Sequence, residues 1–222
     1  MEVKQAISEI TSQLPATTRL VAVSKFHPAE MIREAYDCGQ RIFGESHVQE
    51  LQAKRATLPD DIQWHFIGHL QTNKVKYIVP YIDLIHAVDT PRLLQEISRQ
   101  AERVGRQIPC LLEIHVAQEE TKYGFTPQEC LAYLASGEWR ELNGIRLAGL
   151  MCMASFTEDE QQIAAEFSTA ENLFNKVKKE FFAADPNFCE RSWGMSHDWK
   201  IALQHGSTMV RIGSQIFGER NY

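Results

Sequence analysis

The stretch that decides the fold begins with the apolar run Leu20-Val21-Ala22-Val23-Ser24-Lys25, passes through a helical pattern and ends with the apolar run Arg41-Ile42-Phe43-Gly44. Apolar runs of four to six residues have the length of buried strands. Pro28 stands where a helix accepts proline in its first turn, and Gly39 stands where a helix commonly ends, so residues 29–38 are predicted to be helical. We therefore expect two parallel strands joined by a right-handed helical crossover.

The same alternation continues along the rest of the chain. Six further apolar runs have the length of a strand, at residues 63–68, 84–88, 110–116, 147–153, 190–195 and 208–213. Helical patterns with recognisable first turns lie between some of them, at residues 90–105, 126–137 and 157–182, and an amphipathic helix pattern opens the chain. Eight strands alternating with helices predict an α/β fold, a single TIM-type (β/α)8 barrel with an N-terminal helix, as one domain over residues 1–222. An open doubly wound sheet is the alternative.

Composition and charge argue against several classes of protein. The chain has 222 residues, of which 44% are hydrophobic and 23% charged, as in ordinary globular proteins. No apolar run reaches the ~18 residues of a membrane span and no signal-peptide pattern opens the chain, so we expect a cytoplasmic protein without membrane contact. The net charge of −6 and the lack of a basic run argue against nucleic-acid binding. Five cysteines without C-x-x-C spacing predict reduced thiols.

A lysine stands at the end of the first predicted strand, where barrels of this type carry their functional residues. Val21, Val23 and Lys25 share one face of that strand because side chains alternate along a strand. If this face points into the barrel, burial disfavours the charged amine and makes Lys25 a candidate Schiff-base nucleophile. The alternative is a lysine that extends into solvent from a strand end.

An arginine occupies the corresponding place on the eighth predicted strand, where Arg211 shares a face with Met209. Closure of the barrel puts the eighth strand beside the first, so Arg211 and Lys25 are expected at the same rim. Two neighbouring cations need an anion or an electron-rich ring between them. The alternative for Arg211 is an ion pair with Glu45 or Glu219.

The ends of the seventh and eighth strands resemble a phosphate-binding cup. Gly194-Met195-Ser196 precedes a helix, with Ser196 expected as its N-cap, and Gly213-Ser214 repeats the arrangement. Glycine permits a close backbone approach, and barrels commonly bind phosphate in these two loops. The alternative is two capped helix starts without a ligand. A lysine, an arginine and a phosphate cup on adjoining strands fit pyridoxal 5′-phosphate.

Other motifs carry little chemistry. His65 and His69 are four residues apart, a metal-binding spacing on a helix, but Gly68 interrupts them and His65 lies in a strand, so we expect no metal. His86 is expected to be a strand residue with satisfied hydrogen bonds. The sequence contains no P-loop and no G-x-G-x-x-G motif.

Several segments together resemble the pyridoxal phosphate homeostasis proteins, a barrel family related to the N-terminal domain of alanine racemase and classed as fold type III of the pyridoxal phosphate proteins. The final block is the longest and most specific. The matching segments are residues 21–25 with Pro28, 43–45, 64–71 with Asn73-Lys74, 149–151, 194–196 with Asp198, 206–213 and 216–218.

The resemblance implies roles for individual residues. It implies that Lys25 carries the cofactor as a Schiff base and that Arg211 contacts the ring nitrogen. It also implies phosphate contacts from Ser196, Gly213 and Ser214. Met195 and Ser46 complete the predicted cofactor-binding set. Ser46 stands where the family usually has asparagine.

The expected function is pyridoxal 5′-phosphate binding in intracellular homeostasis of the cofactor and in amino-acid and keto-acid balance. We expect a monomer without catalytic turnover, with pyridoxal-phosphate-dependent apo-enzymes as candidate recipients. Related racemases use a second domain that this chain is expected to lack. An amino-acid racemase and a class I aldolase acting through Lys25 are the enzymatic alternatives.

Overall fold

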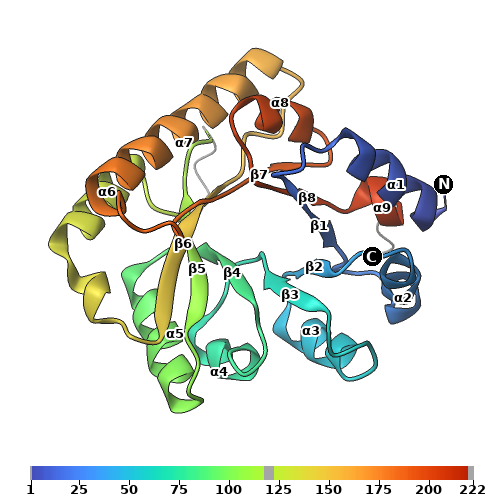
Figure 1. Ribbon diagram of the computed structural model, residues 1–222, viewed down its shortest axis with the longest axis horizontal. Helices are drawn as coiled ribbons and strands as arrows, with labels where there is room; N and C mark the ends of the chain where they lie inside the picture. Colours follow the sequence, from blue (N-terminus) through green and yellow to red (C-terminus); the bar gives the residue numbers. More distant parts are fainter. Residues whose placement is uncertain (1, 118–122, 220–222) are drawn as a thin grey trace.

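The strands form a closed parallel barrel. The computed structural model describes residues 2–117 and 123–219, and Figure 1 shows the strands at the centre with helices around them. Each strand pairs with the next along the chain, and β8 pairs with β1, with Val21 opposite Arg211. The TIM-type barrel is therefore confirmed, and the open doubly wound sheet is wrong. The strands are β1 Arg19–Val23, β2 Ile42–Glu45, β3 Gln63–Phe66, β4 Leu84–Val88, β5 Ile108–Ile114, β6 Ile145–Cys152, β7 Glu190–Met195 and β8 Met209–Ile212.

Helices cover the outside of the barrel (Figure 1). The predicted helices are confirmed to within a few residues at each end. Their bounds, with two 3-10 turns, are α1 Val3–Gln13, α2 Ala29–Asp37, α3 Val48–Arg55, η1 Thr72–Lys74, α4 Val75–Ile78, α5 Pro91–Arg103, α6 Pro127–Ser136, η2 Glu138–Glu141, α7 Glu160–Phe181, α8 Trp199–Gln204 and α9 Ser214–Phe217.

Local sequence signals set several of these helix starts. Thr90 accepts the Leu93 N–H and caps α5, and Thr126 forms a reciprocal capping box with Glu129 at the start of α6. The helix α7 begins at Glu160 because Asp159 accepts the N–H groups of the first turn. Each cap satisfies backbone donors that have no partner within the helix.

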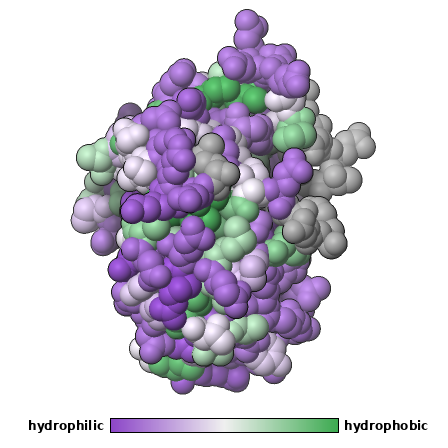
Figure 2. Space-filling model, turned by 90° about the vertical axis from the view of Figure 1, so that its right-hand side faces the viewer, coloured by the Kyte–Doolittle hydropathy of each residue, from purple (hydrophilic) through white to green (hydrophobic). Residues whose placement is uncertain are grey.

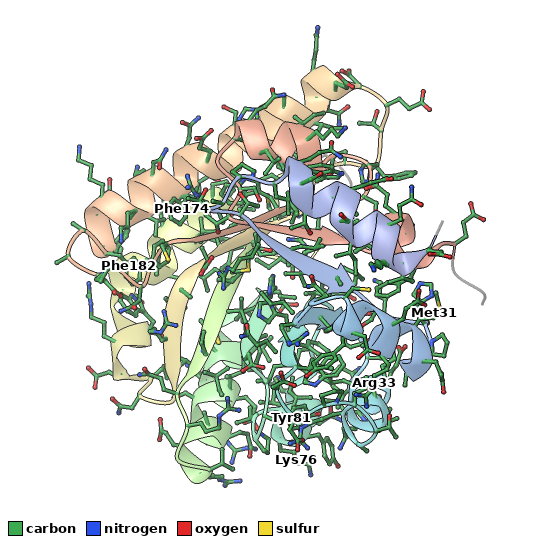
Figure 3. The ribbon with its side chains drawn as sticks, turned by 45° about the vertical axis from the view of Figure 1, so that its right-hand side comes forward. Met31, Arg33, Lys76, Tyr81, Phe174 and Phe182 are labelled. Carbon is green, nitrogen blue, oxygen red and sulfur yellow. The ribbon has the colours of Figure 1, made fainter. Side chains whose placement is uncertain are left out.

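The longest helix is held to the barrel by aromatic stacking. Phe174, on α7, and Phe182, which follows it, both lie on the barrel side of the helix in Figure 3. Their rings stack on the ring of Phe188, with centroid distances of 5.3 and 4.1 Å. All three side chains are buried, so they contribute both apolar burial and ring contacts.

The apolar core has an outer and an inner part. The outer part lies between the strands and the helices, and the inner part fills the barrel with side chains that include Val21 and Met209. Since these two point inward, the alternation along β1 and β8 also directs the next residues on the same faces to the inside. This geometry brings the ends of β1 and β8 to one cavity.

Close strand approach requires glycine at one position of β6. Gly149 has a φ of +156°, and a β-carbon there would lie 1.8 Å from the carbonyl oxygen of Glu190 on β7. The pairing of β5 with β6 shifts register beside this residue, between Cys110 and Leu111. Gly149 therefore lets β6 pack closely against β7, beside the irregular part of the β5–β6 ladder.

The outer surface is mainly polar. Figure 2 shows the side of the molecule that carries α1 and α2, where hydrophilic side chains predominate and apolar ones reach the surface in small patches. Among residues 2–117 and 123–219, no helix combines the length and the apolar character that crossing a bilayer requires. All five cysteines are free thiols.

Candidate functional site

A cavity of about 290 Å³ lies at the carboxyl ends of β1, β7 and β8. Its volume is close to the lower end of the range for small-molecule sites, about 300–1,000 Å³. Six of the seven residues predicted for the site line it. They are Lys25, Met195, Ser196, Arg211, Gly213 and Ser214.

The lysine and the arginine meet at this cavity through the strand register. Lys25 follows the last residue of β1 by two positions and is half-buried. Arg211 lies on β8, directly opposite Val21 of β1, and is buried. Both side chains therefore line one cavity, as the predicted barrel closure requires.

The guanidinium of Arg211 is fixed by oxygen acceptors inside the barrel. Its Nη1 donates to the carbonyl oxygen of Ser192 at 2.7 Å and to Ser192 Oγ at 2.6 Å, and its Nη2 donates to the carbonyl oxygen of Cys152 at 2.9 Å. The alternative ion pair with Glu45 or Glu219 is not formed by these described residues. Burial lowers the pKa of Arg211, while nearby acidic groups oppose that shift.

A chain of buried hydrogen bonds continues from Arg211 across the barrel. Ser192 Oγ lies 2.8 Å from Nδ1 of His86, and Nε2 of His86 lies 2.9 Å from Nδ1 of His65. Burial lowers the pKa of His65 to about 3 and the pKa of His86 well below its usual range, so both rings are neutral. Arginine can only donate, so Ser192 Oγ accepts a hydrogen bond from Arg211 at one end of this chain. These hydrogen bonds thus hold the Arg211 guanidinium from the side that faces the barrel interior.

This arrangement also separates the two histidines of the metal-like spacing. His65 bonds to His86 inside the barrel, whereas Nδ1 of His69 lies 2.7 Å from Oδ2 of Asp89 at the rim. Within the described ranges, no group of three or more metal-ligating side chains is close enough to hold an ion.

The cup at the ends of β7 and β8 differs in detail from the prediction. Ser196 is not an N-cap, because residues 196–198 form a turn and α8 begins at Trp199 after Asp198. Ser196 Oγ instead accepts the Gly213 N–H at 3.3 Å, and so joins the two loops. Ser214 is the first residue of α9, with Gly213 before it.

The backbone of the cup packs closely against the first strand. A β-carbon at Gly213 would lie 3.0 Å from the carbonyl oxygen of Val23 and 3.2 Å from its Cβ. Nothing larger than glycine fits at this point without a shift of β1. The cup is therefore held at a fixed distance from the end of the strand that leads to Lys25.

Ser46 does not line this cavity. It lines a larger neighbouring cavity of about 500 Å³, which shares only Lys25 with the first. Ser46 Oγ is buried without a hydrogen-bond partner, and the Ser46 Cβ lies 2.4 Å from where a β-carbon of Gly68 would be. We take the smaller cavity as the candidate site because Arg211 and the residues of the cup line it.

Five cavity residues were not among the predicted set: Val23, Ile67, Met153, Phe156 and His197. The strand-end rule makes Met153, which directly follows β6, a candidate, although it was not included in the predicted cofactor-binding set. The same rule extended by one residue past Ser196 could have found His197. Phe156 is 84% exposed on a loop and has no sequence signal of this kind. Its ring packs edge-on to that of His197, with centroids 5.0 Å apart, at the cavity mouth.

Comparison with known proteins identifies the class of protein to which this barrel belongs. Residues 2–221 match the family model of the alanine racemase N-terminal domain, and the barrel with a lysine at the end of β1 is consistent with that class. The chain is 39% identical to the pyridoxal phosphate homeostasis protein of Aquifex aeolicus, over 92% of this chain and 88% of the relative. It is also 39% identical to the human protein of that name, over 99% and 83%. The chain belongs to the family of pyridoxal phosphate homeostasis proteins.

Solved structures agree with this assignment. The structure of PipY from Synechococcus elongatus without pyridoxal phosphate has a TM-score of 0.91 and 36% identity, and it covers 98% of this chain and 100% of PipY. PipY with pyridoxal phosphate bound has a TM-score of 0.88 and 35% identity, with the same coverage.

Proposed function

We propose that this chain binds pyridoxal 5′-phosphate in the cavity between β1, β7 and β8 and takes part in homeostasis of the cofactor. The observation that carries the proposal is the meeting of the Lys25 amine, the buried Arg211 guanidinium and the cup hydroxyls in one cavity. The names of its relatives and the ligand of PipY support it.

The residues present fit the chemistry of this cofactor. A phosphate needs several donors, and Ser196, Gly213 and Ser214 offer hydroxyls and backbone N–H groups at one end of the cavity. A ring nitrogen needs one donor, which Arg211 supplies. When bound, pyridoxal phosphate supplies an aldehyde that forms a covalent imine with a primary amine, and Lys25 is the residue proposed to provide that amine.

The hydrogen-bond chain behind Arg211 determines what this residue can do. Its Nη atoms are held by Ser192 and Cys152, so the guanidinium cannot swing away from the cavity. Because arginine stays protonated in proteins, it donates a hydrogen bond without transferring a proton. Arg211 therefore orients a ring nitrogen and leaves it unprotonated.

The first expected result concerns the cup. Ser214→Ala removes one hydroxyl donor to the phosphate, and a hydrogen bond to a charged group is worth about 1.5–3 kcal/mol. We expect pyridoxal phosphate to bind about ten- to hundredfold more weakly, with binding of unphosphorylated pyridoxal almost unchanged. Equilibrium dialysis of both ligands measures this, and Ser8→Ala, at an exposed serine of α1, is the control. Equal weakening of both ligands would show that the loop is structural and the cup elsewhere.

We further propose that the protein does not catalyse amino-acid racemisation. Racemisation needs two positioned acid–base groups, each worth about 10²–10⁴-fold in rate. Lys25 is one, and His197, whose Nε2 lies 3.2 Å from Asp198 Oδ2, is the candidate for the second. The proposal therefore rests on the ring nitrogen and not on a missing base. An unprotonated ring nitrogen beside Arg211 disfavours carbanion formation.

Incubation of the cofactor-loaded protein with L-alanine in deuterated water tests this proposal. We expect α-deuteration no faster than with free pyridoxal phosphate. Rapid deuteration with loss of optical rotation, abolished by Lys25→Ala or His197→Ala, would identify a racemase. The remaining expectations are proposals of the same kind: a one-domain monomer in the cytoplasm, with pyridoxal-phosphate-dependent apo-enzymes as recipients of the cofactor.

A further inference from the structure

The residue after Lys25 has an unusual backbone conformation. Phe26 has a φ of +67°, and it is the one non-glycine residue with positive φ in residues 2–117 and 123–219. Positive φ is unfavourable for a residue with a β-carbon, and such a residue keeps this conformation only where surrounding contacts hold it. Since Phe26 directly follows Lys25, this turn helps to set the direction in which the Lys25 side chain leaves the end of β1.

A buried ionic cluster holds the turn. We call it the Lys54 clamp, and it consists of Lys54, Glu45, Glu50 and Ser24. The Lys54 ammonium lies 2.7 Å from each of three oxygens, namely the carbonyl oxygen of Ser24, Oε1 of Glu45 and Oε1 of Glu50. The same Glu50 oxygen accepts the Phe26 N–H at 2.6 Å.

The clamp contacts both chain neighbours of Lys25. On one side, Ser24 Oγ donates to Glu45 Oε1 at 2.6 Å while the Ser24 carbonyl accepts from Lys54. On the other side, the Phe26 amide donates to Glu50. The three N–H groups of the ammonium match the three acceptors, so its geometry is fully determined.

The cluster is too buried to be an ordinary surface ion pair. The side chains of Lys54 and Glu45 are 7% and 0% exposed. Burial raises the pKa of Glu45 to about 7, and the neighbouring Lys54 opposes that rise. Buried ion pairs are often no more stabilising than apolar side chains of the same volume. An apolar cluster at this place could not make the directional hydrogen bonds by which the charged cluster holds the backbone of Ser24 and Phe26.

We propose that Lys54 is a positioning residue, which acts through Glu45 and Glu50 on Ser24 and Phe26 so that the Lys25 amine faces the aldehyde of the cofactor. This proposal rests on the proposed function, because Lys54 can position the Lys25 amine for the cofactor only if the cofactor binds there. It assigns a role to three charged residues that do not line the cavity of the cup.

Glu50→Ala is the first variant because Glu50 is partly exposed and its removal leaves the Lys54–Glu45 pair in place. Glu34→Ala, at an exposed glutamate of α2, is the matched control. Each is titrated with pyridoxal phosphate and with pyridoxine 5′-phosphate, which has the same phosphate but an alcohol in place of the aldehyde. We expect Glu50→Ala to bind pyridoxal phosphate about tenfold more weakly and pyridoxine phosphate within about twofold of wild type. Lys54→Met should weaken pyridoxal phosphate binding by more than Glu50→Ala does, again with little change for pyridoxine phosphate.

A second measurement uses the cofactor-free protein. Hydrogen exchange of the Phe26 amide should be about tenfold faster in Glu50→Ala, because its acceptor is lost, and unchanged in Glu34→Ala. Equal weakening of both ligands, or no change in either, would overturn the positioning role. If the wild type bound neither ligand, the proposed function would fail, and the exchange rate at Phe26 would still decide whether the clamp holds the turn.

Discussion

Lys25→Ala is expected to abolish the covalent attachment of pyridoxal phosphate. The variant lacks the amine at the end of β1, and the remaining contacts are those of the cup and Arg211. Cofactor held only by these groups should dialyse away, and the absorption band of the covalent adduct should be absent. Absorbance spectra before and after exhaustive dialysis measure both effects.

Lys74→Ala is the matched control for this variant. Lys74 lines the neighbouring cavity that also contains Lys25, so it provides a comparable amine on the same cavity. We expect Lys74→Ala to keep the adduct and its resistance to dialysis. A Lys25→Ala protein that still forms the covalent adduct would remove Lys25 from the site.

Among the variants proposed, Arg211→Met is expected to lower the free energy of unfolding most. The substitution removes the donor to the Ser192 carbonyl, the Ser192 hydroxyl and the Cys152 carbonyl, all inside the barrel. Leaving buried acceptors unpaired costs about 1–3 kcal/mol each, although removal of the buried charge offsets part of this. We expect the free energy of unfolding to fall by about 3 kcal/mol and the Tm by about 6–12 °C.

The appropriate control is an arginine on the surface. Arg33, labelled on α2 in Figure 3, is exposed and makes one long hydrogen bond, to the carbonyl oxygen of Thr57 at 3.4 Å. Arg33→Met should change the free energy of unfolding by less than about 0.5 kcal/mol. Urea unfolding of both variants gives the comparison. A loss for Arg211→Met no greater than that for Arg33→Met would show that the buried contacts do not stabilise the barrel.

The strands could be predicted from the sequence because parallel strands in a barrel are buried on both faces. They consequently form apolar runs such as Leu20–Val23, and all eight predicted runs coincide with strands. The two-residue period of a strand also places Lys25 on the same face as Val21, and Arg211 on the same face as Met209. The cavity that unites the lysine and the arginine follows from closure between β1 and β8.

Features that depend on side-chain direction beyond the strand ends could not be predicted. Ser46 directly follows β2, but its side chain lines only the neighbouring cavity, whereas Lys25 lines both. Ser196 is a favourable N-cap residue, yet the turn before Trp199 puts the N-cap of α8 at Asp198. In both cases the local signal was present and the loop geometry decided the outcome.

Long-range polar contacts were also inaccessible to sequence reasoning. Ser192 and His86 are 106 positions apart, and neither carries a motif that would pair them. The contact of Lys54 with Ser24 spans 30 positions and joins a helix to a loop. Patterns of period two or 3.6 report which face is buried, whereas these bonds depend on which inward faces meet.

The most direct test of the central claim is borohydride reduction of the cofactor-loaded wild-type protein, followed by peptide mapping. Reduction makes an imine between an amine and pyridoxal phosphate permanent, so the modified lysine can be identified by mass. The proposed site predicts a single stable adduct, on Lys25. An adduct on any other lysine, with Lys25 unmodified, would contradict the proposed site.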